Sequence, residues 1–162
     1  SPISDKEVNM NKNILKEHQM EINMIEKEIS DFYGRISSGS VFSDSALWIL
    51  YFLRLTGKPL TQSEICTMMF QSKQTVNSTL KKLCDEGYII FKSSEKDKKR
   101  KPIYLTEKGE RLCADSADKV ISAETAALEC FSEEELAAFI SLHKKYFDNL
   151  KESFSLIYGE LK

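Results

Sequence analysis

The sequence predicts a mainly α-helical fold with a small two- or three-stranded β wing. Apolar residues recur at helical spacing over most of the 162 residues. Two short β-prone runs interrupt this pattern, from Tyr88 to Phe91 and from Ile103 to Leu105, and they flank a polar, basic loop. A chain of this length fits one domain with an adequate core.

A short amphipathic helix is expected just before the first β-prone run. Val76, Leu80 and Leu83 are spaced to share one face. Ser72 is suited to cap the helix, and Gly87 is suited to end it in a left-handed conformation. The other face offers groups that can meet base edges and phosphates in a DNA major groove: Ser72, Lys73, Gln74, Thr75, Asn77, Ser78, Lys81 and Lys82. For this helix alone, an ordinary solvated face is the simpler interpretation.

The loop between the β-prone runs changes that balance. It carries four consecutive cations, Lys98, Lys99, Arg100 and Lys101, and is too polar to pack in a core. These side chains could reach phosphates or an adjacent minor groove. Asp97 is the exception in the run, and we expect it to pair with a wing cation and fix the loop.

The distribution of charge supports a localised anion-binding surface. Residues 72–102 contain nine Lys or Arg and four Asp or Glu, a net charge of +5. The whole chain has a net charge of −2, so the remainder carries −7. A positive field confined to one block favours a docked geometry over nonspecific coating of a polyanion.

A second short helix is expected upstream of the first. Gly57 and Pro59 break the preceding helix, and Thr61 with Glu64 forms a capping box that starts a new one. Two short helices joined by a tight turn, with the second rich in polar groups, make a helix-turn-helix. With the basic hairpin added, the pattern is that of a winged helix-turn-helix.

The segment from Leu60 to Gly109 resembles the multiple antibiotic resistance regulator (MarR) family of bacterial transcription factors. That family has a wing signature of Asp, an Arg two residues later, a short strand and Leu-Thr-x-x-Gly. The matching positions are Asp97, Lys99, Leu105, Thr106 and Gly109. Lys99 departs from the usual Arg, and the family often has Arg at the position of Ser78. The resemblance implies a homodimer that binds palindromic duplex DNA.

Both ends of the chain are expected to form amphipathic helices. The first covers residues 8–36. After the hairpin, Thr106 is suited to cap a helix running to about Glu129, and Ser132 with Glu135 forms a capping box for a last helix. A wide apolar stripe along that last helix needs a partner.

Dimerisation through the terminal helices is the interpretation that we favour, and it is also what the resemblance implies. The alternative is that these helices pack on the central domain of their own chain. The expected organisation is a dimerisation helix within residues 1–42, a winged helix-turn-helix lobe over residues 43–109, and dimerisation helices within residues 110–162. The first seven residues are expected to be disordered.

The resemblance also implies a site for small aromatic or anionic effectors between the dimerisation helices and the DNA-binding lobe. The residues expected to line it are Phe32, Tyr33, Trp48, Tyr51 and Phe52, with Arg35 or Arg54 nearby for an anion. The alternative is that these aromatic residues are plain core, as aromatic stripes at helical spacing usually are.

The sequence contains few motifs that would support another class of function. No Gly-rich phosphate loop or hydrolase motif is present, so we do not expect an enzyme or a cofactor. The two histidines, His18 and His143, do not make a metal signature. The four cysteines form no C-x-x-C pair and no secretory signal precedes them, which predicts reduced thiols and a cytoplasmic location. The longest apolar run is too short to span a membrane.

The function predicted from the sequence is that of a bacterial transcriptional repressor. A protein–protein interaction module with a winged-helix fold is one alternative, but it does not explain the basic run from Lys98 to Lys101. A DNA-binding regulator without an effector is the other, and the sequence does not separate it from a ligand-gated repressor.

Overall fold

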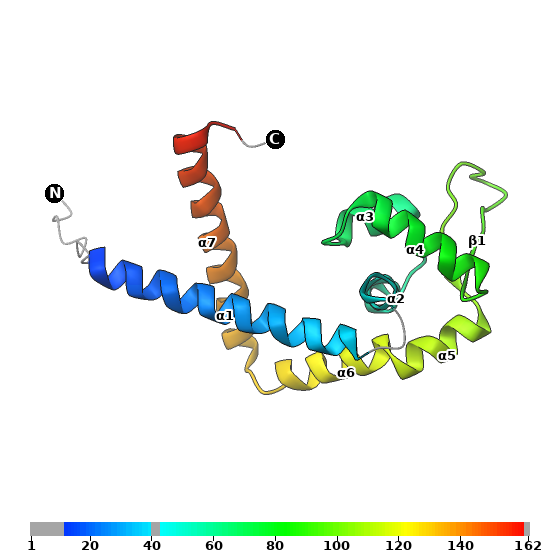
Figure 1. Ribbon diagram of the computed structural model, residues 1–162, viewed down its shortest axis with the longest axis horizontal. Coiled ribbons are helices and arrows are strands. Elements are labelled where there is room, and N and C mark those ends of the chain that lie inside the picture. Colours follow the sequence, from blue (N-terminus) through cyan, green and yellow to red (C-terminus); the bar gives the residue numbers. More distant parts are fainter. Residues whose placement is uncertain (1–11, 40–42, 161–162) are drawn as a thin grey trace.

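The computed structural model describes residues 12–39 and 43–160. The expected disorder of the first seven residues and a helix start at residue 8 lie outside the described residues. The elements follow one another as α1 (Lys12–Ser38), α2 (Asp44–Thr56), α3 (Gln62–Met68), α4 (Lys73–Asp85), β1 (Ile89–Phe91), β2 (Ile103–Leu105), α5 (Glu107–Asp115), α6 (Ala117–Leu128) and α7 (Glu133–Tyr158) (Figure 1). The predicted fold class is confirmed.

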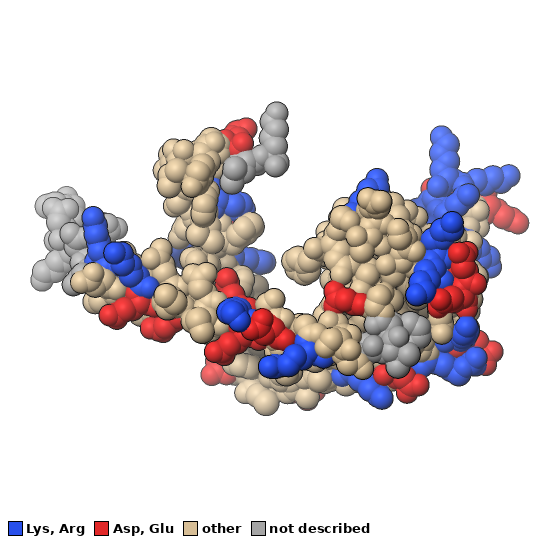
Figure 2. All heavy atoms as spheres, in the orientation of Figure 1, with Lys and Arg blue, Asp and Glu red and all other residues tan. Residues whose placement is uncertain are grey.

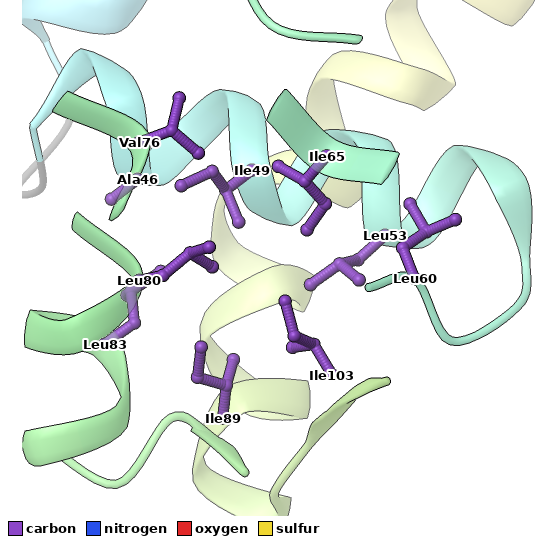
Figure 3. Packing of buried hydrophobic residues seen from close by; sticks show 10 residues of the cluster. All are labelled: Ala46, Ile49, Leu53, Leu60, Ile65, Val76, Leu80, Leu83, Ile89 and Ile103. Carbon is purple, nitrogen blue, oxygen red and sulfur yellow. The ribbon is translucent and has the colours of Figure 1, made fainter. Parts of the chain in front are cut away.

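Two apolar clusters pack against helix α2 and hold the lobe together. The larger cluster joins α2 to α3, α4 and the hairpin through Ala46, Ile49, Leu53, Leu60, Ile65, Val76, Leu80, Leu83, Ile89 and Ile103 (Figure 3). The smaller cluster joins Leu50 of α2 to Cys113 of α5 and Ala117 of α6. Each fully buried Leu, Ile or Val contributes roughly 1.5–3 kcal/mol relative to an exposed one.

Helices α3 and α4 form the predicted helix-turn-helix. The Thr61 hydroxyl accepts a hydrogen bond from the Glu64 backbone N–H, and the Glu64 carboxylate accepts one from the Thr61 N–H. Ser72 caps α4 by accepting the Thr75 N–H at 3.2 Å. Gly87 follows α4 with a φ of 79°, the left-handed conformation expected of it. The caps predicted from the sequence are confirmed.

The hairpin of β1 and β2 forms the predicted wing, with two strands. The strands pair antiparallel and place Ile90 opposite Tyr104. Ile103 also donates its N–H to the Leu60 carbonyl oxygen at 2.8 Å, so an isolated bridge ties the hairpin to the segment before α3. Because the Ile89 side chain is 0% exposed, the inner face of the hairpin belongs to the core.

The prediction of a single helix after the hairpin is wrong, because the helix is interrupted at Ser116 and the segment forms two helices, α5 and α6. Ser116 has φ −134° and ψ −91°, and its hydroxyl donates to the Leu112 carbonyl oxygen at 2.6 Å. Such a bond competes with the backbone ladder. Arg54 of α2 reaches both sides of the break, contacting Glu110 at 2.5 Å and Asp118 at 2.9 Å.

Both terminal helices leave apolar faces uncovered. Helix α7 has no buried residue, and Figure 1 shows it extending away from the lobe. In α1 the buried residue is Ser37. Side chains that are 52–64% exposed include Ile25, Ile29 and Phe32 of α1 and Phe139, Ile140 and Phe147 of α7. The terminal helices therefore do not bury these faces within their own chain.

The first turn of α5 fits against the hairpin because residue 109 is glycine. A Cβ at this position would lie 2.0 Å from the Tyr88 carbonyl oxygen and 3.1 Å from a Leu105 methyl carbon. We expect Gly109→Ala to lower the free energy of unfolding by about 2 kcal/mol, because the backbone must shift. Urea unfolding measures this change.

The matched control is Gly34→Ala, since a Cβ there meets nothing within 4 Å. A glycine replaced by alanine in a helix should leave stability unchanged or raise it by up to about 1 kcal/mol. Equal stability of the two variants would contradict the role given to Gly109.

Candidate nucleic-acid interface

The start of α4 presents its predicted polar face to solvent. Ser72, Lys73, Gln74 and Thr75 are all exposed, whereas Val76 on the opposite face is 0% exposed. The hydroxyl oxygens of Ser72 and Thr75 lie 2.8 Å apart, so each orients the other. Within the described parts of the chain, the side chains of Lys73 and Gln74 form no hydrogen bond or ion pair. They are available to bases and phosphates.

Asn77 is only partly exposed, unlike the residues at the start of α4, and its amide is already engaged within the protein. Its Oδ1 accepts a hydrogen bond from Gln62 Nε2 of α3 at 2.6 Å and lies 3.6 Å from Cys66 Sγ. Its amide joins α3 to α4, and the sequence did not indicate the role of Gln62.

The second half of α4 adds cations to the surface. Lys81 and Lys82 are exposed, and Lys82 lies 4.0 Å from the Glu86 carboxylate in a pair that contributes little. Ser78 is also exposed, and its hydroxyl donates to the Gln74 carbonyl oxygen at 2.9 Å. Figure 2 shows Lys and Arg side chains gathered over α4 and the wing.

One carboxylate fixes the shape of the wing loop. Asp97 Oδ1 accepts the backbone N–H groups of Lys99 and Arg100, both at 3.1 Å, and the Asp97 N–H donates to the Ser94 hydroxyl at 3.1 Å. Asp97 therefore fixes the loop as expected, but the expected partner is wrong. Among the described residues its bonds go to backbone amides, a geometry typical of Asp in turns, and not to a wing cation.

Arg100 is held by a residue that sequence reasoning assigned only to a helix cap. Its Nη2 donates to the two carboxylate oxygens of Glu64 at 3.1 and 3.4 Å. The same carboxylate accepts the Thr61 N–H at 2.8 Å. The bond from Thr61, followed by that from Arg100, lowers the pKa of Glu64. No local pattern relates the two partners, because 36 residues separate them along the chain.

The remaining wing cations have no such partner. Lys98, Lys99 and Lys101 are exposed, and none forms an ion pair with a described residue. The structure thus separates the four predicted wing cations into one held by the helix-turn-helix and three available to an external anion.

The aromatic residues expected to line an effector site form a continuous chain of ring contacts between α1 and α2. Ring centroids lie 6.0 Å apart for Phe32 and Tyr33, 5.5 Å for Tyr33 and Trp48, 5.3 Å for Trp48 and Tyr51, and 5.2 Å for Tyr51 and Phe52. The pairs are edge-on or tilted, as aromatic rings prefer. This aromatic cluster links the N-terminal helix to the lobe.

A carboxylate that sequence reasoning did not indicate contacts the aromatic cluster, beside one of the two expected arginines. Glu124 of α6 accepts the hydroxyl of Tyr33 at 2.6 Å and that of Tyr51 at 2.5 Å. The other expected arginine, Arg54, is bound by carboxylates on both sides of the α5–α6 break. Arg35 lies over the Phe32 ring, 5.9 Å from the centroid. Sequence reasoning missed Glu124, which is 91 and 73 residues from the two tyrosines.

Other candidate chemistry is not assembled in the described part of the chain. It holds no group of three or more His, Cys, Asp or Glu placed to bind a metal ion. No helix among the described residues combines the length and apolar character needed to cross a membrane. Burial raises the pKa of the Cys113 thiol to about 11, so the thiol stays protonated at neutral pH.

Helices α3 and α4, the hairpin and their exposed cations define a winged helix-turn-helix protein. Residues 42–100 match the model of the MarR family. The uncharacterized HTH-type transcriptional regulator YwoH of Bacillus subtilis is 32% identical over 103 residues, which cover 63% of this chain and 74% of that protein. The chain belongs to the MarR family of transcriptional regulators.

Solved structures share the fold. A MarR family regulator from Neisseria meningitidis has a TM-score of 0.63 and 19% identity, with 87% of this chain and 96% of that chain covered. The MepR–DNA complex of S. aureus has a TM-score of 0.59 and 22% identity, with 80% and 93% covered.

The contacts of Glu124 generate a prediction about pH. Burial, followed by the hydrogen bond to Glu124, raises the pKa of Tyr33 to about 12 from 10.0, and the same causes raise the pKa of Tyr51. A raised pKa in the folded state means that this stabilisation is complete below about pH 10 and is lost as the pH rises through about 12. We expect an ultraviolet titration of the phenols to show two late ionisations.

Tyr33→Phe should remove one of these ionisations and lower the free energy of unfolding by about 1 kcal/mol at neutral pH, since the variant cannot donate a hydrogen bond to the Glu124 carboxylate. The control is Tyr158→Phe, at a residue that is 68% exposed and has no bond to Glu124. This variant should keep both late ionisations. A Tyr33→Phe protein with an unchanged titration would refute the assignment.

Proposed function

We propose that this protein represses transcription by binding palindromic duplex DNA as a homodimer. The observation that carries the proposal is the exposed basic surface of α4 and the wing (Figure 2), on a chain whose residues outside 72–102 carry a net charge of −7. Each α4 would lie in a major groove, with the two half-sites about 34–36 Å apart. The wing lysines would contact phosphates or the adjacent minor groove. The complex of S. aureus MepR with DNA supports this placement.

The exposed faces of α1 and α7 support the dimer. Apolar surface of this extent on two long helices requires a partner, and a second copy provides the same two faces. In this proposal residues 1–42 and 110–162 supply the dimerisation helices, and residues 43–109 supply the DNA-binding lobe. Sedimentation equilibrium measures the oligomeric state.

The salt dependence of DNA binding tests the proposed function. We expect replacement of Lys98, Lys99 and Lys101 by Ala to weaken binding to all sequences. The slope of log K against log salt should fall by about 0.9 for each phosphate that the variant no longer neutralises. Fluorescence anisotropy with labelled duplexes at several salt concentrations measures both quantities.

The control is Lys119→Ala, which removes an exposed lysine from α6, outside the basic surface. Its slope should match that of the wild type. If the triple variant and the wild type bind DNA with the same slope, the wing has no part in binding. If the wild-type protein binds no duplex, the alternative of a protein–protein interaction module stands.

Control by a small-molecule effector is a second proposal, which the position of the aromatic cluster supports. The rings of Tyr33 and Trp48 join α1, a dimerisation helix in this proposal, to α2 of the lobe. A ligand inserted there would change the angle between them and therefore the spacing of the recognition helices. A near-complete switch requires about 5.5 kcal/mol of differential affinity. Near Tyr33 and Tyr51 the adjacent charge is the carboxylate of Glu124, so a neutral aromatic compound fits that end of the cluster better than an anion, whereas Arg35 lies over Phe32 at the other end.

Trp48 is the single tryptophan of the sequence and therefore reports on the aromatic cluster. We expect a neutral aromatic effector to change Trp48 emission and to release DNA over the same concentration range. Tyr33→Phe should shift both curves together. If no compound alters DNA affinity, regulation without an effector is the better account.

A further inference from the structure

We infer that Glu64 is a positioning residue for DNA binding, because it holds the wing against the helix-turn-helix through Arg100, and that Arg100 itself does not contact DNA. The inference rests on the proposed function. It gives Glu64 a role beyond its helix cap, and it removes one of the four wing cations from the set of DNA contacts.

The strands alone do little to orient the wing loop. The last strand pair is Phe91 with Ile103. Beyond it, the backbone bond from the Lys92 N–H to the Pro102 carbonyl oxygen, at 3.1 Å, closes the loop. A two-stranded hairpin this short is marginal without further support. The bridge from Ile103 to Leu60 and the buried side chains of the strands hold the base of the hairpin, so the direction of the loop beyond the strands depends on contacts that the loop itself makes.

Two contacts of the loop provide that support. Asp97 binds the backbone N–H groups of residues 99 and 100 and so fixes the shape of the loop. From this fixed backbone the side chain of Arg100 extends to α3, where its Nη2 donates hydrogen bonds to both carboxylate oxygens of Glu64 in the first turn. The first contact is internal to the wing, whereas the second joins the wing to the helix-turn-helix.

Glu64 is itself held in place. Its carboxylate accepts the Thr61 N–H, so the helix cap fixes the acceptor before Arg100 binds. The same bonds keep the pKa of Glu64 low, and the carboxylate stays ionised. The side chains of Glu64 and Arg100 are 42% and 50% exposed, so the pair contributes little to overall stability. Its main effect is on the orientation of the loop that carries Lys98, Lys99 and Lys101.

A double-mutant cycle in DNA affinity tests the inference. Glu64→Gln keeps the cap, because Gln also serves in capping boxes, and removes the charge that holds Arg100. Arg100→Met keeps most of the aliphatic stem. We expect each variant to weaken binding about threefold to tenfold, and the double variant to be no weaker than either single one. Weaker binding by Glu64→Gln is diagnostic, since removing an acid near DNA would otherwise strengthen it.

The salt dependence separates positioning from contact. Arg100→Met should leave the slope of log K against log salt unchanged, whereas Lys99→Ala should lower it by about 0.9. The inference is overturned if Arg100→Met lowers the slope in the same way, or if Glu64→Gln binds more tightly than the wild type. If the wild-type protein binds no duplex, the proposed function fails together with the inference. If the wild-type protein binds DNA but the variants give either of the two results above, the inference alone fails.

Urea unfolding establishes that the variants keep the fold. If Glu64→Gln loses stability, the Arg100→Met variant tests the inference on its own, because Arg100 takes part in no helix cap. Weaker DNA binding by Arg100→Met, with an unchanged slope of log K against log salt, supports the inference.

Discussion

Burial of helix α2 (Asp44–Thr56) on several sides is the constraint on which the rest of the molecule depends. Ile49 packs into the cluster shared with α4 and the hairpin, whereas Leu50 packs against α5 and α6. Trp48 contacts the ring of Tyr33 on α1, and the hydroxyl of Tyr51 donates to the carboxylate of Glu124 on α6. In a close-packed interior, a helix held on three sides cannot rotate without opening a cavity or exposing apolar surface. Helices α1, α4, α5 and α6 are therefore all positioned relative to α2.

Local sequence predicted those parts of the structure that local contacts determine. Ser72 caps α4 through an amide three residues away, and Gly87 ends that helix through its own backbone freedom, so short-range patterns were sufficient. The break at Ser116 was not predictable in this way, because no Gly or Pro marks it and Arg54 of a distant helix binds both sides. The bond between Arg100 and Glu64 likewise depends on the folded arrangement of the wing.

The candidate sites show the same division. The buried stripe of α4 places Gln74 on the exposed face, as periodicity predicted. Asn77 lies at the boundary between the faces, where a helical wheel does not decide, and the amide of Gln62 draws it toward α3. For the aromatic cluster, helical spacing predicted that the rings lie together but not that a carboxylate contacts them. That carboxylate belongs to Glu124 of α6, which is 91 residues from Tyr33 and 73 from Tyr51 along the chain.

Acidic residues within a basic surface require a physical reason, because each one weakens the attraction for a polyanion. In the segment with a net charge of +5, Asp97 directs its carboxylate to backbone amides of the wing loop. Glu64 binds the start of α3 and the wing together. Both acids are thus placed where they fix geometry, and the exposed side chains of Lys98, Lys99 and Lys101 remain available to an external anion. Attraction without orientation would give a protein that coats DNA, whereas a wing held at a set angle to α4 can match the separation of a minor groove from its neighbouring major groove.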